Sequence, residues 1–216
     1  MVLDSLEWLG HAGFRLSVGG AAVYIDPFRV PDGPHADAIL ITHGHYDHYS
    51  PQDVERLSHE GTVLIGPPAV AERAPGAVVS LVPGQAVELG AVRGVEVAAV
   101  PAYNTSKRDP SGALFHPREA GGLGFHLNVR GERLYHSGDT DVIPEMDVVA
   151  GADVALLAVS GVYVMTPAEA VEAARRIQPR VAVPMHWGTD VGSRGDAEAF
   201  AEQAPVDVRI MEPVAA

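Results

Sequence analysis

Short apolar runs separated by turn-forming residues recur along the chain, and most have the length of a β-strand. Residues 6–16 and 21–25 predict two strands of a hairpin, because Gly19-Gly20 between them is a typical turn pair. Residues 36–42 predict a buried strand that leads into a histidine-rich loop. Further strands are predicted over residues 62–65, several within 77–100, 153–159, 181–184 and 206–211, and a second hairpin over residues 123–135 turns at Arg130-Gly131.

Helix signals stand between these strands. Pro51 after Ser50 predicts a helix over residues 51–60, with serine as the N-cap and proline at the first helical position. Thr166-Pro167-Ala168-Glu169 is a capping box that predicts a helix to Gln178. Two more helices are predicted, a short alanine-rich one before Pro75-Gly76 and one over residues 196–203. Each half of the chain thus runs from strands through a polar loop to helix and strand, and this order predicts an α/β protein whose helices cover packed sheets on both sides.

Composition narrows the class of protein. The chain has 216 residues, 47% hydrophobic and 20% charged, which predicts one globular domain over residues 1–216. No apolar stretch reaches the ~20 residues that span a membrane, and the N-terminus lacks the basic segment of a signal peptide, so we expect a cytoplasmic protein. The formal net charge of −13 attracts neither nucleic acid nor an anionic membrane. We therefore expect a small-molecule substrate, and neither a membrane nor a nucleic-acid polymer as partner; the sequence leaves the oligomeric state open, a homo-oligomer included.

The loop His43-Gly44-His45-Tyr46-Asp47-His48 carries four potential metal ligands within six residues. Ligands at this spacing cannot all face one way on a regular strand or helix, so a tight loop must gather them. The chain has no cysteine, so a metal must be held by histidine and carboxylate. This donor set suits Zn²⁺, with Fe or Mn as competitors. The loop predicts a metal centre, and two metal ions; the alternative is a polar loop with coincidental histidines.

Three more metal-competent side chains lie after predicted strands or in the long loop over residues 103–122. They are Asp139, His186 and His116. Loops at strand ends are where a rigid scaffold usually presents functional side chains, and loops as long as residues 103–122 are usually functional or disordered.

Together these segments resemble the metallo-β-lactamase superfamily. The resemblance is carried by His43-x-His45-x-Asp47-His48, Gly138-Asp139-Thr140 and His186-Trp187-Gly188, with Asp26-Pro27 similar to that superfamily's first motif. Three further segments, residues 8–14, 135–141 and 162–166, are similar to a compact branch of metal-dependent hydrolases related to L-ascorbate-6-phosphate lactonase. The resemblance covers residues 8–188 and implies an αββα sandwich with the site along one edge.

The resemblance also implies a ligand set. One ion would be held by His43, His45 and a third histidine, and the other by Asp47, His48 and His186, with Asp139 bridging both. The usual position of the third histidine, near residues 100–104, has none in this chain. His116 is the nearest candidate, and it requires the long loop to fold back. Without it the first site is weaker, and an enzyme with one ion becomes the alternative.

Other side chains have two interpretations each. Asp47 would also orient the attacking water, and His11 is either a functional group of the site or a hydrogen-bonded histidine between strands. His136 either orients Asp139 by a hydrogen bond or is a simple strand-end residue. Asp26 is expected to be a buried carboxylate that orders the histidine loop. The remaining candidates are pocket-lining or packing residues and anion-binding or solvated arginines: Tyr103, Asn104, Tyr163, Trp187, Arg108 and Arg118.

These observations predict a metal-dependent hydrolase that uses a metal-activated water on a small ester, lactone, amide or phosphodiester. Zinc is the expected cofactor, as one or two ions, with Mn²⁺ or Fe as alternatives. Three other functions stay open: a hydrolase of small phosphodiesters or nucleotides, an iron-dependent oxidoreductase, and a non-catalytic metal-binding protein on the same fold.

Overall fold

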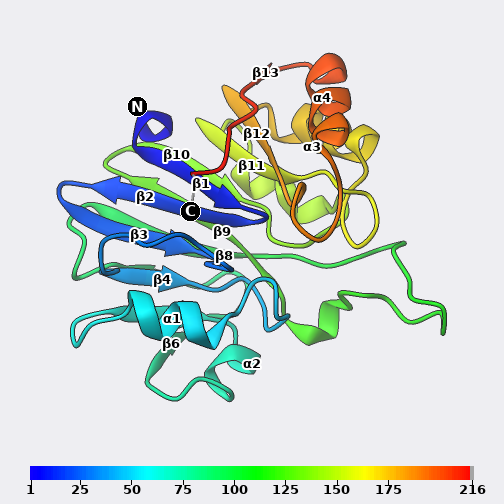
Figure 1. Ribbon diagram of the computed structural model, residues 1–216. Helices are drawn as coiled ribbons and strands as arrows, with labels where there is room; N and C mark the ends of the chain where they lie inside the picture. The colour runs from blue at the N-terminus through cyan, green and yellow to red at the C-terminus, as the bar shows by residue number, and fades with distance from the viewer. Residues whose placement is uncertain (215–216) are drawn as a thin grey trace.

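Two β-sheets lie at the centre of the protein in a computed structural model, which describes residues 1–214 (Figure 1). Within these residues the first sheet has six strands, in spatial order β1 (Leu6–Gly10), β2 (Gly13–Val18), β3 (Ala21–Ile25), β4 (Ala38–Leu40), β5 (Val63–Gly66) and β6 (Val78–Ser80). The strands from β1 to β3 pair antiparallel, and those from β3 to β6 pair parallel.

The second sheet repeats this combination. In the described chain its seven strands lie in the order β13 (Asp207–Val208), β12 (Val181–Met185), β11 (Val154–Ala158), β10 (Glu132–His136), β9 (Leu123–Val129), β8 (Val95–Pro101) and β7 (Ala86–Glu88). The strands β10 to β13 are parallel, and β10 to β7 are antiparallel.

Helices lie on the outer faces of both sheets (Figure 1). Those of the first sheet are α1 (Pro51–Leu57) and α2 (Pro68–Ala71), and those of the second are α3 (Pro167–Ile177) and α4 (Arg194–Gln203). Three short 3₁₀ helices cover Val2–Ser5, Arg118–Ala120 and Pro144–Val149. Among the described residues, we find no helix with the length and apolarity that crossing a membrane requires.

The alternation of side chains along the strands creates two separate cores. In β3, Val23 and Ile25 face the second sheet and belong to the large core, whereas Tyr24 faces the opposite way. Tyr24 packs in a smaller core with α1 residues such as Val54 and Leu57. The period of two residues in a strand produces this division, and the result is four layers with the sheets inside.

Several predicted elements have different limits in the structure. Residues 6–16 were predicted as one strand, but they form β1 and β2, because Gly10 (φ 99°) and His11 (φ 51°) turn the chain back. The helix predicted over residues 51–60 ends at Leu57, and the strand predicted over 206–211 is only the two residues of β13. The Ser50 cap, which accepts a hydrogen bond from the Asp53 amide, and the capping box of Thr166 are confirmed.

The parallel strands determine where the site lies. Their carboxyl ends lead directly to Asp26 after β3, the histidine loop after β4, Asp139 after β10 and His186 after β12. The two sheets meet at this edge, where the Leu123 amide donates to the Thr42 carbonyl at 2.9 Å. Ligands in open α/β sheets usually bind beyond the carboxyl ends of parallel strands, and this edge gathers the predicted metal ligands.

Candidate metal centre

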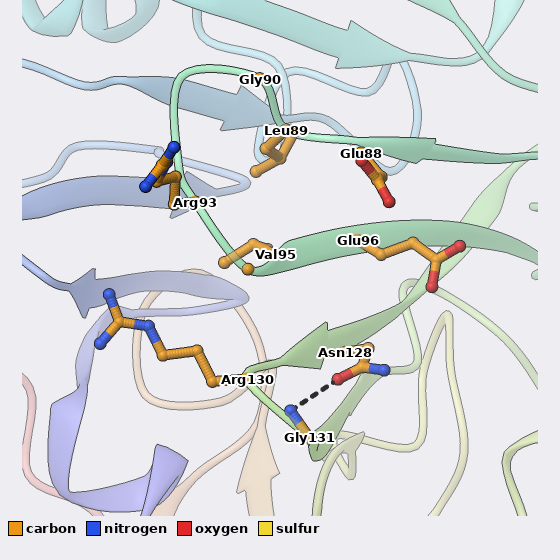
Figure 2. Close-up of a pocket in the computed structure, with 10 residues that line it drawn as sticks. Glu88, Leu89, Gly90, Arg93, Val95, Glu96, Asn128, Arg130 and Gly131 are labelled. Atoms are coloured by element: carbon orange, nitrogen blue, oxygen red, sulfur yellow. Dashed lines mark hydrogen bonds between the residues drawn. The ribbon is translucent and has the colours of Figure 1, made fainter.

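A hollow of about 440 Å³ lies at the far end of the second sheet, between the turns that precede β8 and β10 (Figure 2). Its lining includes Arg93 and Arg130 and contains none of the predicted metal ligands. The seven residues of β8 lead from this hollow towards the other end of the sheet, a path of ~20 Å. A second pocket of about 330 Å³ opens there over His45, Asp47 and Asp139.

Asp26 holds the histidine loop in place. Its Oδ1 accepts a hydrogen bond from the Thr42 amide at 2.8 Å, and its Oδ2 lies 2.6 Å from Thr42 Oγ1 and 2.7 Å from His48 Nδ1. Asp26 is fully buried and adopts φ 44°, a left-handed conformation that aspartate tolerates better than most residues. Because Nδ1 of His48 is bound to Asp26, its Nε2 faces the site. These contacts are those expected of a carboxylate that orders the loop.

The first group of ligands contains His43, His45 and His116. Both His43 Nε2 and His116 Nε2 lie 3.1 Å from His45 Nδ1. The opposite ring nitrogens have partners: His43 Nδ1 lies 3.0 Å from Thr42 Oγ1, and His116 Nδ1 donates to Asn104 Oδ1 at 3.0 Å. Burial lowers the pKa of His43 well below its usual value, and it also lowers the pKa of His116. Both rings are therefore neutral, as metal ligands must be.

The second group contains Asp47, His48 and His186, with His11 beside them; ligand atoms of all four lie within 4.8 Å of one another. His186 Nδ1 is 3.0 Å from Ser160 Oγ, which leaves Nε2 towards the site. The buried His11 ring places Nε2 at 3.0 Å from Asp47 Oδ2. Burial by itself raises the pKa of Asp47, but the hydrogen bond from His11 and the charge of His48 lower it to about 2. Asp47 is therefore a carboxylate at neutral pH.

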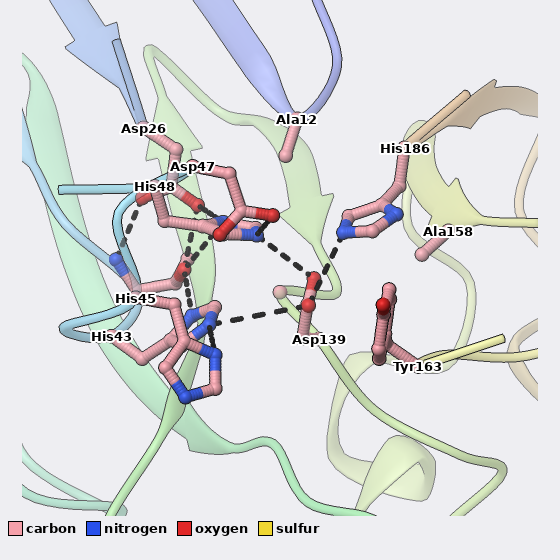
Figure 3. A network of polar contacts seen from close by, with 12 residues as sticks. Ala12, Asp26, His43, His45, Asp47, His48, Asp139, Ala158, Tyr163 and His186 are labelled. Carbon is pink, nitrogen blue, oxygen red and sulfur yellow. Dashed lines mark hydrogen bonds and ion pairs between the residues drawn. The ribbon is translucent and has the colours of Figure 1, made fainter. Parts of the chain in front are cut away.

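Asp139 lies between the two groups (Figure 3). Its Oδ1 is 3.2 Å from His48 Nε2, and its Oδ2 is 3.2 Å from His186 Nε2 and 3.3 Å from His116 Nε2. Burial raises the pKa of Asp139, but the rings of His186 and His48 outweigh it and hold this pKa well below the usual range. For His48, burial lowers the pKa, and the carboxylates of Asp139 and Asp26 raise it well above its ordinary value. One ionised carboxylate thus lies within reach of both groups.

Unpaired buried atoms show that these residues fit a cation. Among the described residues, His48 Nε2, His186 Nε2, Asp139 Oδ1 and His11 Nδ1 are buried and make no hydrogen bond of normal geometry, although the two imidazole nitrogens of His48 and His186 lie 3.2 Å from the Asp139 carboxylate. Buried polar atoms are nearly always paired, and each exception needs an explanation. The first three atoms belong to predicted ligands and converge, so a metal ion there would satisfy them. Imidazole and carboxylate donors suit zinc, manganese or iron.

The long loop brings His116 to the first group. Asp141 anchors the start of this loop by accepting from the amides of Thr105 and Ser106 at 2.8 Å and from Asn104 Nδ2 at 3.2 Å. Asn104 Oδ1 then accepts from the amide of His116 at 2.8 Å as well as from its ring. The loop therefore folds back, as the prediction for His116 required.

The other candidates divide between pocket and scaffold. Tyr163 lines the 330 Å³ pocket, whereas Tyr103 lies 3.0 Å from Glu145 and Trp187 packs against Trp8. His136 did not prove to orient Asp139: in the described structure it donates from Nε2 to the Ala12 carbonyl and accepts the Gly138 amide. Neither loop arginine is among the described residues that line this pocket, since Arg118 pairs with Glu145 and Arg108 donates to the Gly112 carbonyl.

The sequence did not indicate the hydroxyl groups that contact the ring nitrogens of two predicted metal ligands. Thr42 and Ser160 hold His43 and His186, and neither has a spacing that marks it. Each follows a strand that leads to the site, and this position is the only signal that could have found it.

Comparisons with known proteins agree with this geometry. Residues 5–186 match the family model described as the β-lactamase superfamily domain. The chain is 34% identical to a UPF0173 metal-dependent hydrolase of Methanopyrus kandleri, over 96% of both chains. A relative with the same description from Thermus thermophilus is 31% identical, over 92% of this chain and 90% of that one.

Solved structures show the same architecture. A metal-dependent hydrolase from Parabacteroides distasonis superposes with a TM-score of 0.83 at 31% identity, covering 97% of this chain and 93% of the other. Igni18, a metallo hydrolase from Ignicoccus hospitalis, superposes with a TM-score of 0.78 at 24% identity, covering 97% and 95%. The predicted α/β sandwich is confirmed, and so is a metal-dependent hydrolase. The chain therefore belongs to the metallo-β-lactamase superfamily, among the metal-dependent hydrolases of the UPF0173 family.

Proposed function

We propose that this hydrolase works with two zinc ions and cleaves a small ester, lactone, amide or phosphodiester. The observation that supports the proposal is the position of Asp139 between two groups of ligands, each with three donors of its own. Each group satisfies the usual count for a catalytic zinc, which is three protein ligands and one open position. Asp139 lies within reach of both groups, and its charge would offset that of cations bound there.

Bound zinc would supply two effects: it lowers the pKa of a water ligand towards neutrality, and it polarises the bond to be cleaved. The protein contributes position. Asp47 is ionised at neutral pH and lines the pocket, so its carboxylate can orient the water by accepting a hydrogen bond from it. His11 holds this carboxylate in one orientation by donating from Nε2 to Oδ2.

The pocket accommodates a small substrate. Its volume of about 330 Å³ is at the lower end of the range for small-molecule sites. Tyr46 and Tyr163 line its walls and carry hydroxyl groups. These hydroxyls can donate hydrogen bonds to oxygen atoms of the substrate, as oxyanion-stabilising groups do.

Metal analysis of the purified protein tests the proposal. We expect two zinc ions per chain after zinc reconstitution, and a clear loss of bound metal in His43→Ala and Asp139→Ala. His59→Ala is the matched control, because His59 is an exposed histidine outside both groups of ligands. Unchanged metal content in the first two variants would refute the assignment of the site, and iron as the tightly bound metal of the native protein would favour an oxidoreductase.

A further inference from the structure

We infer that the pocket over the metal centre selects an uncharged substrate with a flat apolar group and discriminates against phosphorylated or carboxylated substrates. This inference rests on the proposed function and narrows its substrate class. It is carried by the lining of the pocket: above the metal-competent side chains, the walls consist of Tyr46, Phe115, Tyr163 and Val191, with Asp190 as their charged member.

The walls are aromatic on two sides, and each side is a packed pair. Phe115 and Tyr163 meet edge to face with ring centroids 4.7 Å apart, and Tyr46 contacts Phe28 in the same manner at 5.7 Å. Tyr46 is nevertheless 64% exposed, an unusual fraction for a large aromatic side chain. Aromatic rings that are fixed by a neighbour and open on one face suit the stacking of a planar group. The walls therefore recognise flat apolar surface.

Recognition of a phosphate or carboxylate group normally uses arginine or lysine. Among residues 1–214, none of the side chains that line this pocket is arginine or lysine, and its two histidines, His45 and His116, belong to the first group of metal ligands. Arg29 lies beside this lining, because it pairs with Asp190 through Nη1 at 3.1 Å and 3.3 Å and covers the Phe28 ring at 4.6 Å. Asp190 thus pairs with Arg29, and in the described structure the lining of this pocket offers neither arginine nor lysine to hold an anionic group.

Other basic residues near the site are also occupied. Lys107 binds both oxygens of Glu169 at 2.7 Å and Arg118 binds Glu145, whereas Arg73 donates to the Gly44 carbonyl and lines a neighbouring pocket rather than this one. The net charge of −13 adds a long-range repulsion of anions. Metal ions would attract the reacting group itself, but a second charge farther along the substrate would face the aromatic walls and Asp190 in this pocket.

Three substrates with the same leaving group test this inference on the zinc-loaded protein. They are 4-nitrophenyl benzoate, which is uncharged, and two anions, 4-nitrophenyl hemisuccinate and bis(4-nitrophenyl) phosphate. The kcat/KM of each is divided by its rate constant with free hydroxide, which corrects for intrinsic reactivity. We expect the benzoate to exceed both anions by at least about 10-fold, a ratio that corresponds to the interactions of one charged group.

Two variants test the cause of this preference. Asp190→Asn frees Arg29, and we expect kcat/KM for the hemisuccinate to rise severalfold relative to the benzoate. Asp147→Asn is the matched control, since it also removes one negative charge and frees an arginine, Arg176. This pair lies away from the pocket, near the contact between the Gly151 amide and the Ile177 carbonyl. Tyr46→Ala is expected to lower kcat/KM for the benzoate by about 3- to 10-fold, because it removes one aromatic wall of the pocket.

Ligand-observed NMR on the metal-free protein gives a readout that does not depend on turnover. We expect methyl benzoate to bind more tightly than benzoate, and Tyr46→Ala to weaken this binding. The inference would be overturned if the protein hydrolysed either anion in preference to the benzoate, or if methyl benzoate and benzoate bound equally well. Either result would leave the proposed hydrolase function unaffected. If the zinc-loaded protein hydrolyses none of the three substrates, both the proposed function and the inference that rests on it are wrong.

Discussion

Asn104 should control the affinity of the first metal group, although it is not itself a ligand. Its Oδ1 accepts from the amide and the ring of His116 at 2.8 and 3.0 Å. Its Nδ2 donates to the Tyr163 carbonyl at 2.9 Å and to Asp141 Oδ1 at 3.2 Å. Asn104 is 2% exposed, so water cannot replace these bonds. In Asn104→Ala, the His116 ring loses the contact that fixes its orientation.

The contacts of Asn104 indicate how much stability and how much zinc affinity Asn104→Ala should lose. Three hydrogen bonds between neutral groups at ~1 kcal/mol each and one to a carboxylate at ~2 kcal/mol set an upper value of about 5 kcal/mol for the loss of stability. A group that orients a metal-ligating histidine typically changes metal affinity by about 10- to 100-fold. We therefore expect Asn104→Ala to bind zinc at the first group 10- to 100-fold more weakly than the unmodified protein.

Competition with a chromophoric chelator at pH 7 measures the affinity, and urea unfolding of the metal-free protein measures the stability. Asp109→Ala is the matched control, because it removes a hydrogen-bonded carboxylate of the same long loop and leaves both bonds between Asn104 and His116 in place. We expect it to lose stability and to keep its zinc affinity. If Asn104→Ala loses stability but binds zinc as tightly as the unmodified protein, the orientation of His116 does not depend on Asn104 and the reasoning is refuted.

Three further predictions concern the second metal group and its support. His11→Ala should lower kcat by about 10-fold or more with zinc content unchanged, because Asp47 loses the donor that orients it; an equal loss of metal in elemental analysis would instead assign His11 as a ligand. The pKa of Asp47 falls from 3.8 to about 2 on folding, so its ~2 kcal/mol of stability is fully present above pH 4 and disappears as the pH falls towards 2. Urea unfolding of the metal-free protein at pH 5 and pH 2.5 should therefore show a smaller pH effect in Asp47→Asn, and equal effects in both proteins would contradict this. Asp26→Ala should destabilise the metal-free protein by about 3 kcal/mol and weaken zinc binding, since Thr42 and His48 both lose their acceptor; a melting temperature equal to that of the unmodified protein would show that Asp26 does not hold the loop.

The sequence predicted the fold best where local signals agree with one another. Glycine pairs mark the hairpin turn between β2 and β3, and the capping box of Thr166 marks the start of α3. The edge that carries the site was also predictable, because Asp139 and His186 directly follow strands and parallel strands present their carboxyl ends together. Short-range patterns of this kind depend on neighbouring residues alone, so they can be read without a structure.

Contacts between distant segments could not be read in this way. The turn at His11 lies inside an apolar run, and His11 has a positive φ. A distant segment stabilises this turn, because the His11 carbonyl accepts from the amide of His186 at 2.8 Å, in addition to the nearby Trp8 ring nitrogen at 3.0 Å. The position of His116 depends on hydrogen bonds of the long loop with Asp141. No periodicity in the sequence records such partners, because they are side chains brought together only when both sheets have formed.

The displaced third histidine has a consequence for how the site works. His116, which can bind a metal ion, directly follows Phe115, a wall residue of the pocket. Asn104 binds both His116 and the backbone of Tyr163. The Tyr163 ring packs edge to face against Phe115. A cation bound by His116 therefore restricts the same loop that carries the aromatic wall. Because a ligand that binds an ordered state pays less conformational entropy, zinc at the first group should tighten the binding of apolar ligands in the pocket. Methyl benzoate should accordingly bind more tightly to the zinc-loaded protein than to the metal-free protein, and Asn104→Ala should reduce this difference.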